Sequence, residues 1–528
     1  MFEQFLRLFN NDLLMQMISY MSSMDYVHFG TILSQNREQI IRKMKISQKD
    51  TIFRITEDDL KTISSLTNIE YLDLGVKPRL EYLSDKSKND IGNNNILDLI
   101  NLTHLTHLNL SSRNKITEDA ITALIKFTNL TRLALKNLEH LTDFHINLFS
   151  RTLTNLKNLN ISDTKIHDQG LKLLSNLINL EDINISNSTY LTDEGIKFLK
   201  NMTNLKTLRM GNSTDFTNSV LNILTGLTNL TYLNIFNLQS FRNFESLSVL
   251  TNLVELDISS TSVNNINFLY KLTKLKYLNL SNRSNMDEIL NLNVLANLTN
   301  LEKLKMSECK FINIPNIFYY MSDLKELYLN TVEIDIKQIL NLTNLEKLKI
   351  TSSILHNIDD LTYLTNINQL YLHGNSIKNV DFLKSLTNLT KLSMYFEEIS
   401  DTSPIIYLKK LENIIIDDVF DNINLLSQLP KLREIVIENI HADNDLNQLS
   451  QLTNLKIIKF YYADSMTDYD QLNILLNIPS LEEIHLITEE NPMLYPNTLI
   501  NNKILEIKRY TYPRIKHYIF YLNPNRFF

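Results

Sequence analysis

The chain has 528 residues, of which 43% are hydrophobic and 21% are charged, and its formal net charge is −7. A single hydrophobic core stops growing near roughly 250–300 residues. The length therefore requires either several domains or a repeat architecture that extends its core lengthwise. The negative charge argues against a general nucleic-acid-binding protein, which is usually basic. The single cysteine allows no internal disulfide and no cysteine-based zinc cluster, so a reducing compartment is expected.

The N-terminus carries no predicted targeting or membrane signal. The opening "MFEQFLRLFNNDLL" has an early acidic residue and lacks the continuous apolar segment of a signal peptide. No apolar run in the chain approaches the ~18 residues of a membrane span. We therefore expect a cytoplasmic or nuclear protein that is neither secreted nor bound to a membrane.

Residues 1–48 predict a small helical unit. The apolar residues Leu13, Leu14, Met17, Ile18 and Met21 have the spacing of an amphipathic helix. A break at "SSMD" follows, and then comes a second apolar set: Tyr26, Phe29, Ile32 and Leu33.

This segment resembles an F-box. The matching positions are Leu8, Asp12, Leu13, Leu14, Met17, Ser19, Tyr20, Met21, Asp25, Leu33 and Ser34. Phe9 stands at the proline position of the motif and Arg37 at the tryptophan position. The resemblance implies docking on a Skp-type adaptor of a cullin-RING ubiquitin ligase. The residues divided between that docking face and the unit's own core would be Leu8, Leu13, Leu14, Met17, Ile18 and Met21. The alternative is a plain helical cap on the repeats that follow.

A nine-residue phrase, L-x-x-L-x-x-L-x-L, recurs along residues 49–500, as in "LTNLEKLKI". Its final L-x-L alternates with period two, which predicts a short strand with one buried face. The phrase has eighteen copies, which open at residues 66, 102, 127, 153, 177, 202, 227, 250, 272, 298, 321, 342, 364, 386, 408, 429, 452 and 478.

The segments between these strands differ along the chain. Early copies continue with text such as "LTDEGIKFLKNM", which predicts a helix that begins at a Thr or Asp cap. Later copies such as "NSIKNVDFLKSL" leave room for only a turn or two of helix. A strand and a returning segment repeated every 20–29 residues resemble the leucine-rich-repeat family. The early copies resemble the repeats of F-box/leucine-rich-repeat proteins, and the later ones resemble those of internalins. The resemblance implies an α/β solenoid, a curved horseshoe with short parallel strands on its concave face.

The tetrapeptide LTNL is interpreted as scaffold. Its Thr-Asn corner predicts short polar side chains that bond loop backbone groups, so its Asn-Leu-Thr sequons need no glycan to explain them. The single Cys309 is interpreted as the buried filler of a polar slot after the strand. Other copies place Thr164, Thr261, Ser353 and Asn375 in this slot.

Two segments depart from the repeat. "DKSKNDIGNNN" at 85–95 predicts a mobile inserted loop. Residues 501–528, which include "KRYTYPRIKHYIFYLNPNRFF", predict a terminal cap over the open end of the solenoid.

The strand part of each repeat reads L-x-x-L-x-L-x and begins at the fourth residue of the phrase. Its third, fifth and seventh positions point away from the core and form the predicted concave face. In the first half of the chain the fifth position is a polar row. From residue 303 onward lysine and aromatic residues replace it, which suits an acidic or phosphorylated protein segment. The alternative is an ordinary solvated strand face. The residues of this candidate partner site are Lys303, Lys305, Tyr328, Lys347, Lys349, Tyr371, His373, Lys391 and Tyr395.

No Gly-rich phosphate loop, GxSxG or HExxH motif occurs, so we expect no catalytic residue, cofactor or metal. The function that the sequence favours is recruitment of a protein substrate to a ubiquitin ligase, with a Skp-type adaptor and cullin as partners. The alternative is a ubiquitin-independent interaction scaffold. A secreted adhesin, suggested by the internalin-like repeats, is disfavoured by the lack of a signal peptide.

Overall fold

The structure is a computed structural model of the chain, which divides into two compact units, residues Met1–Asn300 and Leu301–Phe528. The expected adaptor-binding residues, 8 to 21, and Cys309 lie outside the described residues. The described residues are 45–47, 60, 63–64, 69–75, 91–281, 291–307, 316–395, 399–416, 423–438, 446–461, 475, 478–488 and 506–511.

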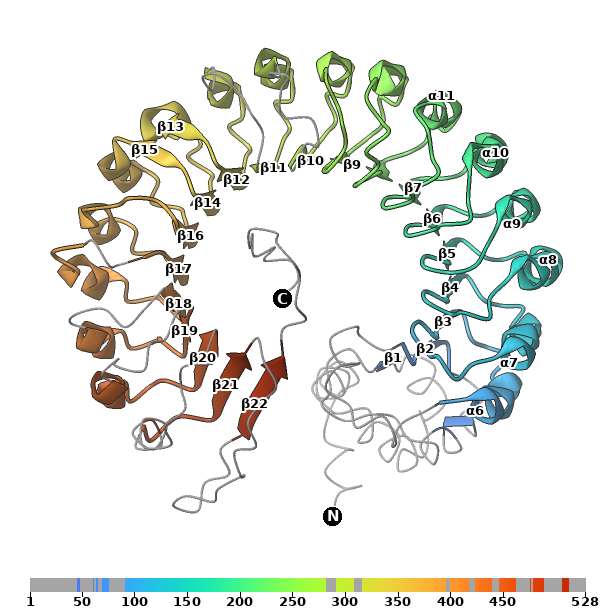
Figure 1. Ribbon diagram of the computed structural model, residues 1–528, viewed down its shortest axis with the longest axis horizontal. Coiled ribbons are helices and arrows are strands. Elements are labelled where there is room, and N and C mark those ends of the chain that lie inside the picture. The colour runs from blue at the N-terminus through green and yellow to red at the C-terminus, as the bar shows by residue number, and fades with distance from the viewer. Residues whose placement is uncertain are drawn as a thin grey trace, which may run out of the picture. The chain divides into compact units, whose positions relative to one another are not determined.

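Unit 1 is built from parallel strands, each of which pairs with the next along the chain. The strands line its inner side and the helical segments its outer side (Figure 1). The strands are β1 (Lys45–Ser47), β2 (Tyr71–Asp73), β3 (His107–Asn109), β4 (Arg132–Ala134), β5 (Asn158–Asn160), β6 (Asp182–Asn184), β7 (Thr207–Arg209), β8 (Tyr232–Asn234), β9 (Glu255–Asp257) and β10 (Tyr277–Asn279).

The returning segments of unit 1 begin as α-helices and shorten to 3-10 helices. The α-helices are α6 (Asn93–Asp98), α7 (Glu118–Ala123), α8 (Asp143–Thr152), α9 (Asp168–Leu174), α10 (Asp193–Ile196) and α11 (Ser219–Leu224). The 3-10 helices are η2 (Leu99–Asn101), η3 (Leu124–Lys126), η4 (Lys197–Asn201), η5 (Glu245–Val249), η6 (Asn267–Lys271) and η7 (Leu292–Asn297).

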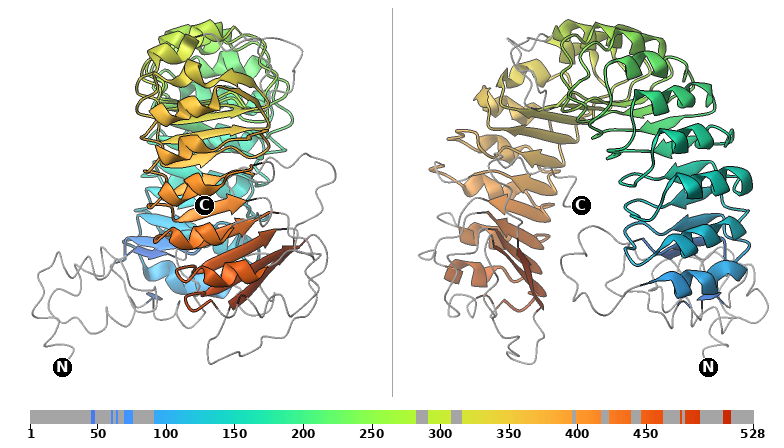
Figure 2. Two further views of the ribbon diagram at one scale, coloured as in Figure 1. Left: turned by 90° about the vertical axis from the view of Figure 1, so that its left-hand side faces the viewer. Right: turned by 45° about the vertical axis from the view of Figure 1, so that its right-hand side comes forward.

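Unit 2 continues the same construction with 3-10 helices on its outer side (Figure 2). Its inner strands pair in parallel in the order β11 (Lys303–Ser307), β12 (Glu326–Asn330), β14 (Lys347–Thr351), β16 (Gln369–Tyr371), β17 (Lys391–Ser393), β18 (Asn413–Ile416), β19 (Glu434–Ile437), β20 (Ile457–Tyr461), β21 (Glu483–Thr488) and β22 (Glu506–Thr511). A separate parallel pair joins β13 (Glu333–Asp335) to β15 (Ile354–His356). The 3-10 helices are η8 (Asn316–Tyr320), η9 (Ile336–Ile339), η10 (Ile358–Tyr363), η11 (Asp381–Lys384), η12 (Ser403–Tyr407), η13 (Ile423–Gln428) and η14 (Leu446–Gln451).

The repeat phrase forms the core and fixes the strands, as the sequence predicts. In the copy that opens at 153, Leu153, Leu156, Leu159 and Ile161 are all buried. Each fully buried aliphatic side chain contributes roughly 1.5–3 kcal/mol of burial free energy. In all eighteen copies the strand begins five residues after the phrase opens. The prediction of a leucine-rich-repeat solenoid is therefore confirmed.

The Thr-Asn corner is scaffold, as predicted. The phrase asparagine donates through Nδ2 to a backbone carbonyl in the corner of the preceding copy, at 2.8 to 3.1 Å. These bonds satisfy backbone groups that no strand reaches. The donors are Asn129, Asn155, Asn179, Asn204, Asn229, Asn252, Asn300, Asn344, Asn366 and Asn388.

The polar slot after the strand also has its predicted role. Thr164 and Thr261 donate to the carbonyls of Ile161 and Ile258 at 2.6 and 2.7 Å. Asn375 donates to two carbonyls, each at 2.7 Å, and accepts from the backbone N–H of Ser353. A small polar side chain in this slot therefore closes the turn.

Three sequence expectations need correction. Residues 93–95 of the expected loop are helical, because the Asn95 side chain accepts from the Gly92 N–H at 2.9 Å and starts α6. Residues 506–511 of the expected cap continue the sheet in register, with Ile507 opposite Ile484. The expected Thr or Asp cap is also not general, because α9 is preceded by His167. Asp168 is the first helical residue of α9 and accepts a hydrogen bond from the Thr192 N–H of the next copy.

Candidate protein-binding face

The fifth position of the repeat has a structural duty in unit 1. Its side-chain oxygen accepts the backbone N–H two residues further on and so holds the turn after the strand. The distance is 3.0 Å for Asn109, Asn160, Asn184 and Asp257. Asn234 and Asn279 make the same contact at 3.2 and 3.1 Å. The polar row predicted for the first half of the chain is therefore a row of turn caps.

From β11 onward, in unit 2, the fifth position no longer carries a turn-capping asparagine or aspartate. The strand register places Lys305, Tyr328, Lys349, Tyr371 and Ser393 in one column at the fifth position. A lysine side chain has no acceptor, so it cannot cap the turn in this way. In β11, β12 and β14 the strand pairing continues to the seventh position, so the backbone two residues further on belongs to the sheet and needs no side-chain cap. The fifth position is thereby free to carry lysine and tyrosine.

The third position forms a second column beside the first. It contains Lys303, Glu326, Lys347, Gln369 and Lys391, opposite one another in that order. The predicted lysines and tyrosines therefore gather on the strand side of one unit. We call the third and fifth positions of β11, β12, β14, β16 and β17, with His373 and Tyr395, the lysine–tyrosine face.

Each tyrosine ring of the two columns lies among lysine ammonium groups. The Nζ atoms of Lys303, Lys305 and Lys347 lie 5.5, 5.1 and 5.5 Å from the ring centre of Tyr328. Those of Lys347 and Lys391 lie 5.4 and 5.8 Å from the ring centre of Tyr371. Such cation–π contacts are favourable, and more so when they are shielded from water.

The tyrosines differ from the sequence expectation in their exposure. Tyr328 and Tyr371 are each only 4% exposed. Side chains on strands ~4.8 Å apart fill the space between one another, and the long lysine stems flank the rings. These two tyrosines therefore position the lysines rather than offer contact area of their own.

Glu326 is a member of the face that the sequence analysis did not single out. Its Oε2 atom lies 2.8 Å from Lys303 Nζ and accepts from the Tyr328 hydroxyl at 2.6 Å. Burial opposes its ionisation, but the hydrogen bonds from Lys303 and Tyr328 lower the pKa of Glu326. The feature that identifies Glu326 as part of the face is its place in the third-position column, opposite both Lys303 and Lys347.

The lysines of the face are crowded cations. Burial, followed by the charges of Lys347 and Lys305, lowers the pKa of Lys349 to about 8. Burial also lowers the pKa of Lys391 to about 8 and lowers that of Lys347. Five lysines stand against one carboxylate, Glu326, at the third and fifth positions of these strands. Added negative charge would therefore stabilise the protonated amines.

His373 and Tyr395 extend the face at the seventh position. The His373 Nδ1 atom lies 3.0 Å from Ser393 Oγ, and its ring centre is 6.0 Å from that of Tyr395. Burial, and then the charge of Lys349, lower the pKa of His373 to about 4. His373 is therefore neutral at pH 7. The Tyr395 hydroxyl donates to Glu438 at 3.4 Å.

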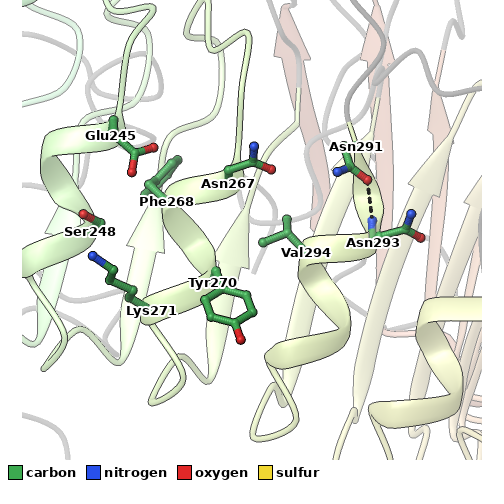
Figure 3. A pocket seen from close by; sticks show the side chains of 9 residues that line it. All are labelled: Glu245, Ser248, Asn267, Phe268, Tyr270, Lys271, Asn291, Asn293 and Val294. Carbon is green, nitrogen blue, oxygen red and sulfur yellow. Dashed lines mark hydrogen bonds between the residues drawn. The ribbon is translucent and has the colours of Figure 1, made fainter.

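Two hollows in the described part of unit 1 carry charges of both signs or scaffold amides. A hollow of about 470 Å³ lies on the helical side of unit 1, between η5, η6 and η7 (Figure 3). Phe268 and Val294 are buried there, and Tyr270 is exposed. Its charged side chains, Glu245 and Lys271, are of opposite sign. A second hollow of about 540 Å³ follows the asparagine corners, whose amides already serve the scaffold.

Among the described residues, no group of three or more His, Cys, Asp and Glu side chains is placed to hold a metal ion. None of the helices in the described ranges is long and apolar enough to cross a bilayer.

Comparison with known proteins adds structural likenesses. No protein-family model matches the chain, and no curated protein matches it significantly. An internalin of Listeria monocytogenes is 25% identical over 65% of this chain and 93% of its own, with a TM-score of 0.49. A leucine-rich-repeat protein of Leptospira interrogans is 19% identical over 84% of this chain and 100% of its own, with a TM-score of 0.47. A plant peptide hormone receptor is 18% identical over 81% and 80% of the two chains, with a TM-score of 0.39. The assignment of the fold rests on the chain's own register: this is a leucine-rich-repeat solenoid.

Proposed function

We propose that this chain recruits a protein partner through an acidic or phosphorylated segment that binds the lysine–tyrosine face. The observation that carries the proposal is the change of the fifth position from turn-capping asparagine to lysine and tyrosine. Five lysines stand against Glu326 within the face and against Glu434 and Glu438 at its edge, an excess of positive charge that favours a negatively charged partner. The lysines lie on the first, third and fifth of five paired strands, a spread that suits a polypeptide better than a small molecule.

A finer proposal concerns the purpose of the recruitment. The F-box-like pattern of residues 1–48 supports a role as substrate-recognition subunit of a Skp–cullin–F-box ubiquitin ligase in the cytoplasm or nucleus. The chain would then select the substrate and leave the chemistry to other subunits. Without adaptor binding, the same face would serve a ubiquitin-independent scaffold.

The experiment separates the two levels within the full chain. Leu13→Asp with Met17→Asp should abolish co-purification of a Skp-type adaptor, while Lys347→Glu should leave adaptor binding intact. Lys347→Glu should instead abolish retention of the partner identified with the wild-type chain. A wild-type chain that never retains the adaptor would remove the ligase role. Partner retention unchanged by Lys347→Glu would remove the lysine–tyrosine face as the binding surface.

A further inference from the structure

The lysines of the third-position column recur on every second paired strand. Lys303, Lys347 and Lys391 lie on β11, β14 and β17, and the intervening strands β12 and β16 carry Glu326 and Gln369. Paired strands lie ~4.8 Å apart, so consecutive lysines of this column are spaced by ~10 Å along the stack. The fifth-position column repeats the same period, with Lys305 and Lys349 on either side of Tyr328.

This spacing matches one repeat of an extended polypeptide. An extended chain in the polyproline-II conformation advances ~3.1 Å per residue with three residues per turn, so side chains three residues apart lie on the same side and ~9 Å apart. A peptide that crosses the strands in this direction meets a lysine-bearing strand at every third residue. We propose that the lysine–tyrosine face binds an extended segment with an acidic residue at every third position, which runs across β11, β12, β14, β16 and β17. The inference rests on the proposed function and specifies the partner's charge pattern.

Glu326 makes the pattern selective. It lies opposite both Lys303 and Lys347, so a peptide carboxylate above β12 would meet a like charge. Like charges in contact oppose binding, and such repulsion is a common source of specificity. A continuous block of acidic residues would place at least one carboxylate near Glu326. The face should therefore prefer spaced acidic residues to clustered ones at the same net charge.

Lys347 is the centre of this arrangement. Its Nζ atom is shared between the Tyr328 and Tyr371 rings, at 5.5 and 5.4 Å from their centres. The ammonium group therefore lies between the two tyrosine rings. It is not paired with Glu326 or Gln369, its neighbours in the third-position column. Burial lowers the pKa of Lys347, Glu326 opposes that change, and Lys303 adds to it. The middle acidic residue of the segment would supply the additional negative charge at this point.

The test measures binding of synthetic peptides to the full chain by fluorescence anisotropy. The spaced peptide carries three glutamates at every third position, separated by neutral polar residues. The clustered peptide has the same composition with the three glutamates adjacent. The swapped peptide replaces the middle glutamate of the spaced peptide by lysine. The protein variants are Lys347→Glu and the matched control Lys378→Glu, an exposed lysine of the same unit.

The expected result is binding of the spaced peptide at least about tenfold tighter than the clustered one. Lys347→Glu should reverse the order of the spaced and swapped peptides, which also shows that the variant is folded. Lys378→Glu should behave as wild type. Equal binding of the spaced and clustered peptides would overturn the register while the proposed function stands. Binding of neither acidic peptide, or tighter Lys347-dependent binding of a single-stranded RNA oligomer, would overturn both.

Discussion

At single positions of the lysine–tyrosine face, a charged side chain stands where unit 1 has a side chain that stabilises a turn. In unit 1 an asparagine such as Asn184 uses its side chain to hold the next turn, at 3.0 Å from the Ser186 N–H. Lys349 occupies the equivalent column in unit 2, is only 9% exposed, and keeps an amine whose pKa burial lowers to about 8. Burial of this charge is therefore unfavourable for the fold at the point where the face concentrates positive charge.

Replacing Lys349 by methionine should make this exchange measurable. Exchange of a buried charge for an apolar residue of similar volume is often neutral or stabilises by roughly 1–4 kcal/mol. Lys349→Met should thus keep or raise the thermal unfolding midpoint at pH 7 and weaken binding of the spaced acidic peptide. Lys378→Met should change neither quantity. A lower midpoint together with unchanged peptide binding would show that Lys349 serves the scaffold.

His145 predicts a pH dependence of stability in unit 1. It is fully buried in the first turn of α8, where Nδ1 lies 3.2 Å from the Thr142 backbone N and accepts its hydrogen bond. Burial lowers the pKa of His145 in the folded state. The unfolded chain, with a histidine pKa of ~6.5, therefore binds more protons, so stability should fall as the pH drops through ~6.5.

Glutamine at position 145 keeps an acceptor for the capping box and does not titrate. His145→Gln should therefore flatten the pH dependence of the free energy of unfolding between roughly pH 6.5 and pH 5. Urea unfolding at fixed pH values measures this dependence. The same slope in both proteins would assign the acid sensitivity to other groups.

At the scale of the elements, an aspartate at the start of one helix anchors the next repeat. Asp168 begins α9 and accepts from the Thr192 N–H and hydroxyl at 2.8 and 2.7 Å, where Thr192 caps α10. A Cβ atom on Gly195 would come within 2.3 Å of the Asp168 Oδ1 atom. Gly195 is therefore required by its neighbour and not by its own helix.

A double-mutant cycle tests this coupling. Gly195→Ala should destabilise the wild-type chain by on the order of 1–3 kcal/mol because of the overlap with the carboxylate. In an Asp168→Ala background the same change should cost less, since only the contact with the Cα atom of residue 168 at 3.1 Å remains and alanine exceeds glycine in helix propensity by ~1 kcal/mol. Denaturant unfolding of the four proteins gives the coupling energy. Equal effects of Gly195→Ala in both backgrounds would contradict the steric explanation.

Much of the element order could be predicted because each copy of the nine-residue phrase marks one strand and the returning segment after it. Burial of four aliphatic positions fixes where each strand begins, and the text after the strand separates helical returns from short ones. β22 was missed because its copy lacks the LTNL corner, although "LEIKRY" keeps the period-two alternation. β13 and β15 are three residues each and pair on a second sheet, which is too short a pattern to recognise.

At the scale of the whole molecule, the sequence predicts which positions share a column but not how they pack. The candidate residues of the lysine–tyrosine face are found from periodicity alone. The burial of Tyr328 and Tyr371 depends instead on how side chains of adjacent strands fill the space between them, which no single repeat encodes. The role of Glu326 emerges only once its neighbours in the register are known.

Photo-crosslinking of the spaced acidic peptide to the full chain tests the central claim most directly. The peptide would carry a photoreactive group beside its middle glutamate, and mass spectrometry would locate the adducts. Adducts confined to residues 303–395, and lost in Lys347→Glu, are the predicted result. Adducts on the strand side of unit 1, or adducts in residues 303–395 that persist in Lys347→Glu, would contradict the assignment of the lysine–tyrosine face as the surface that binds the partner.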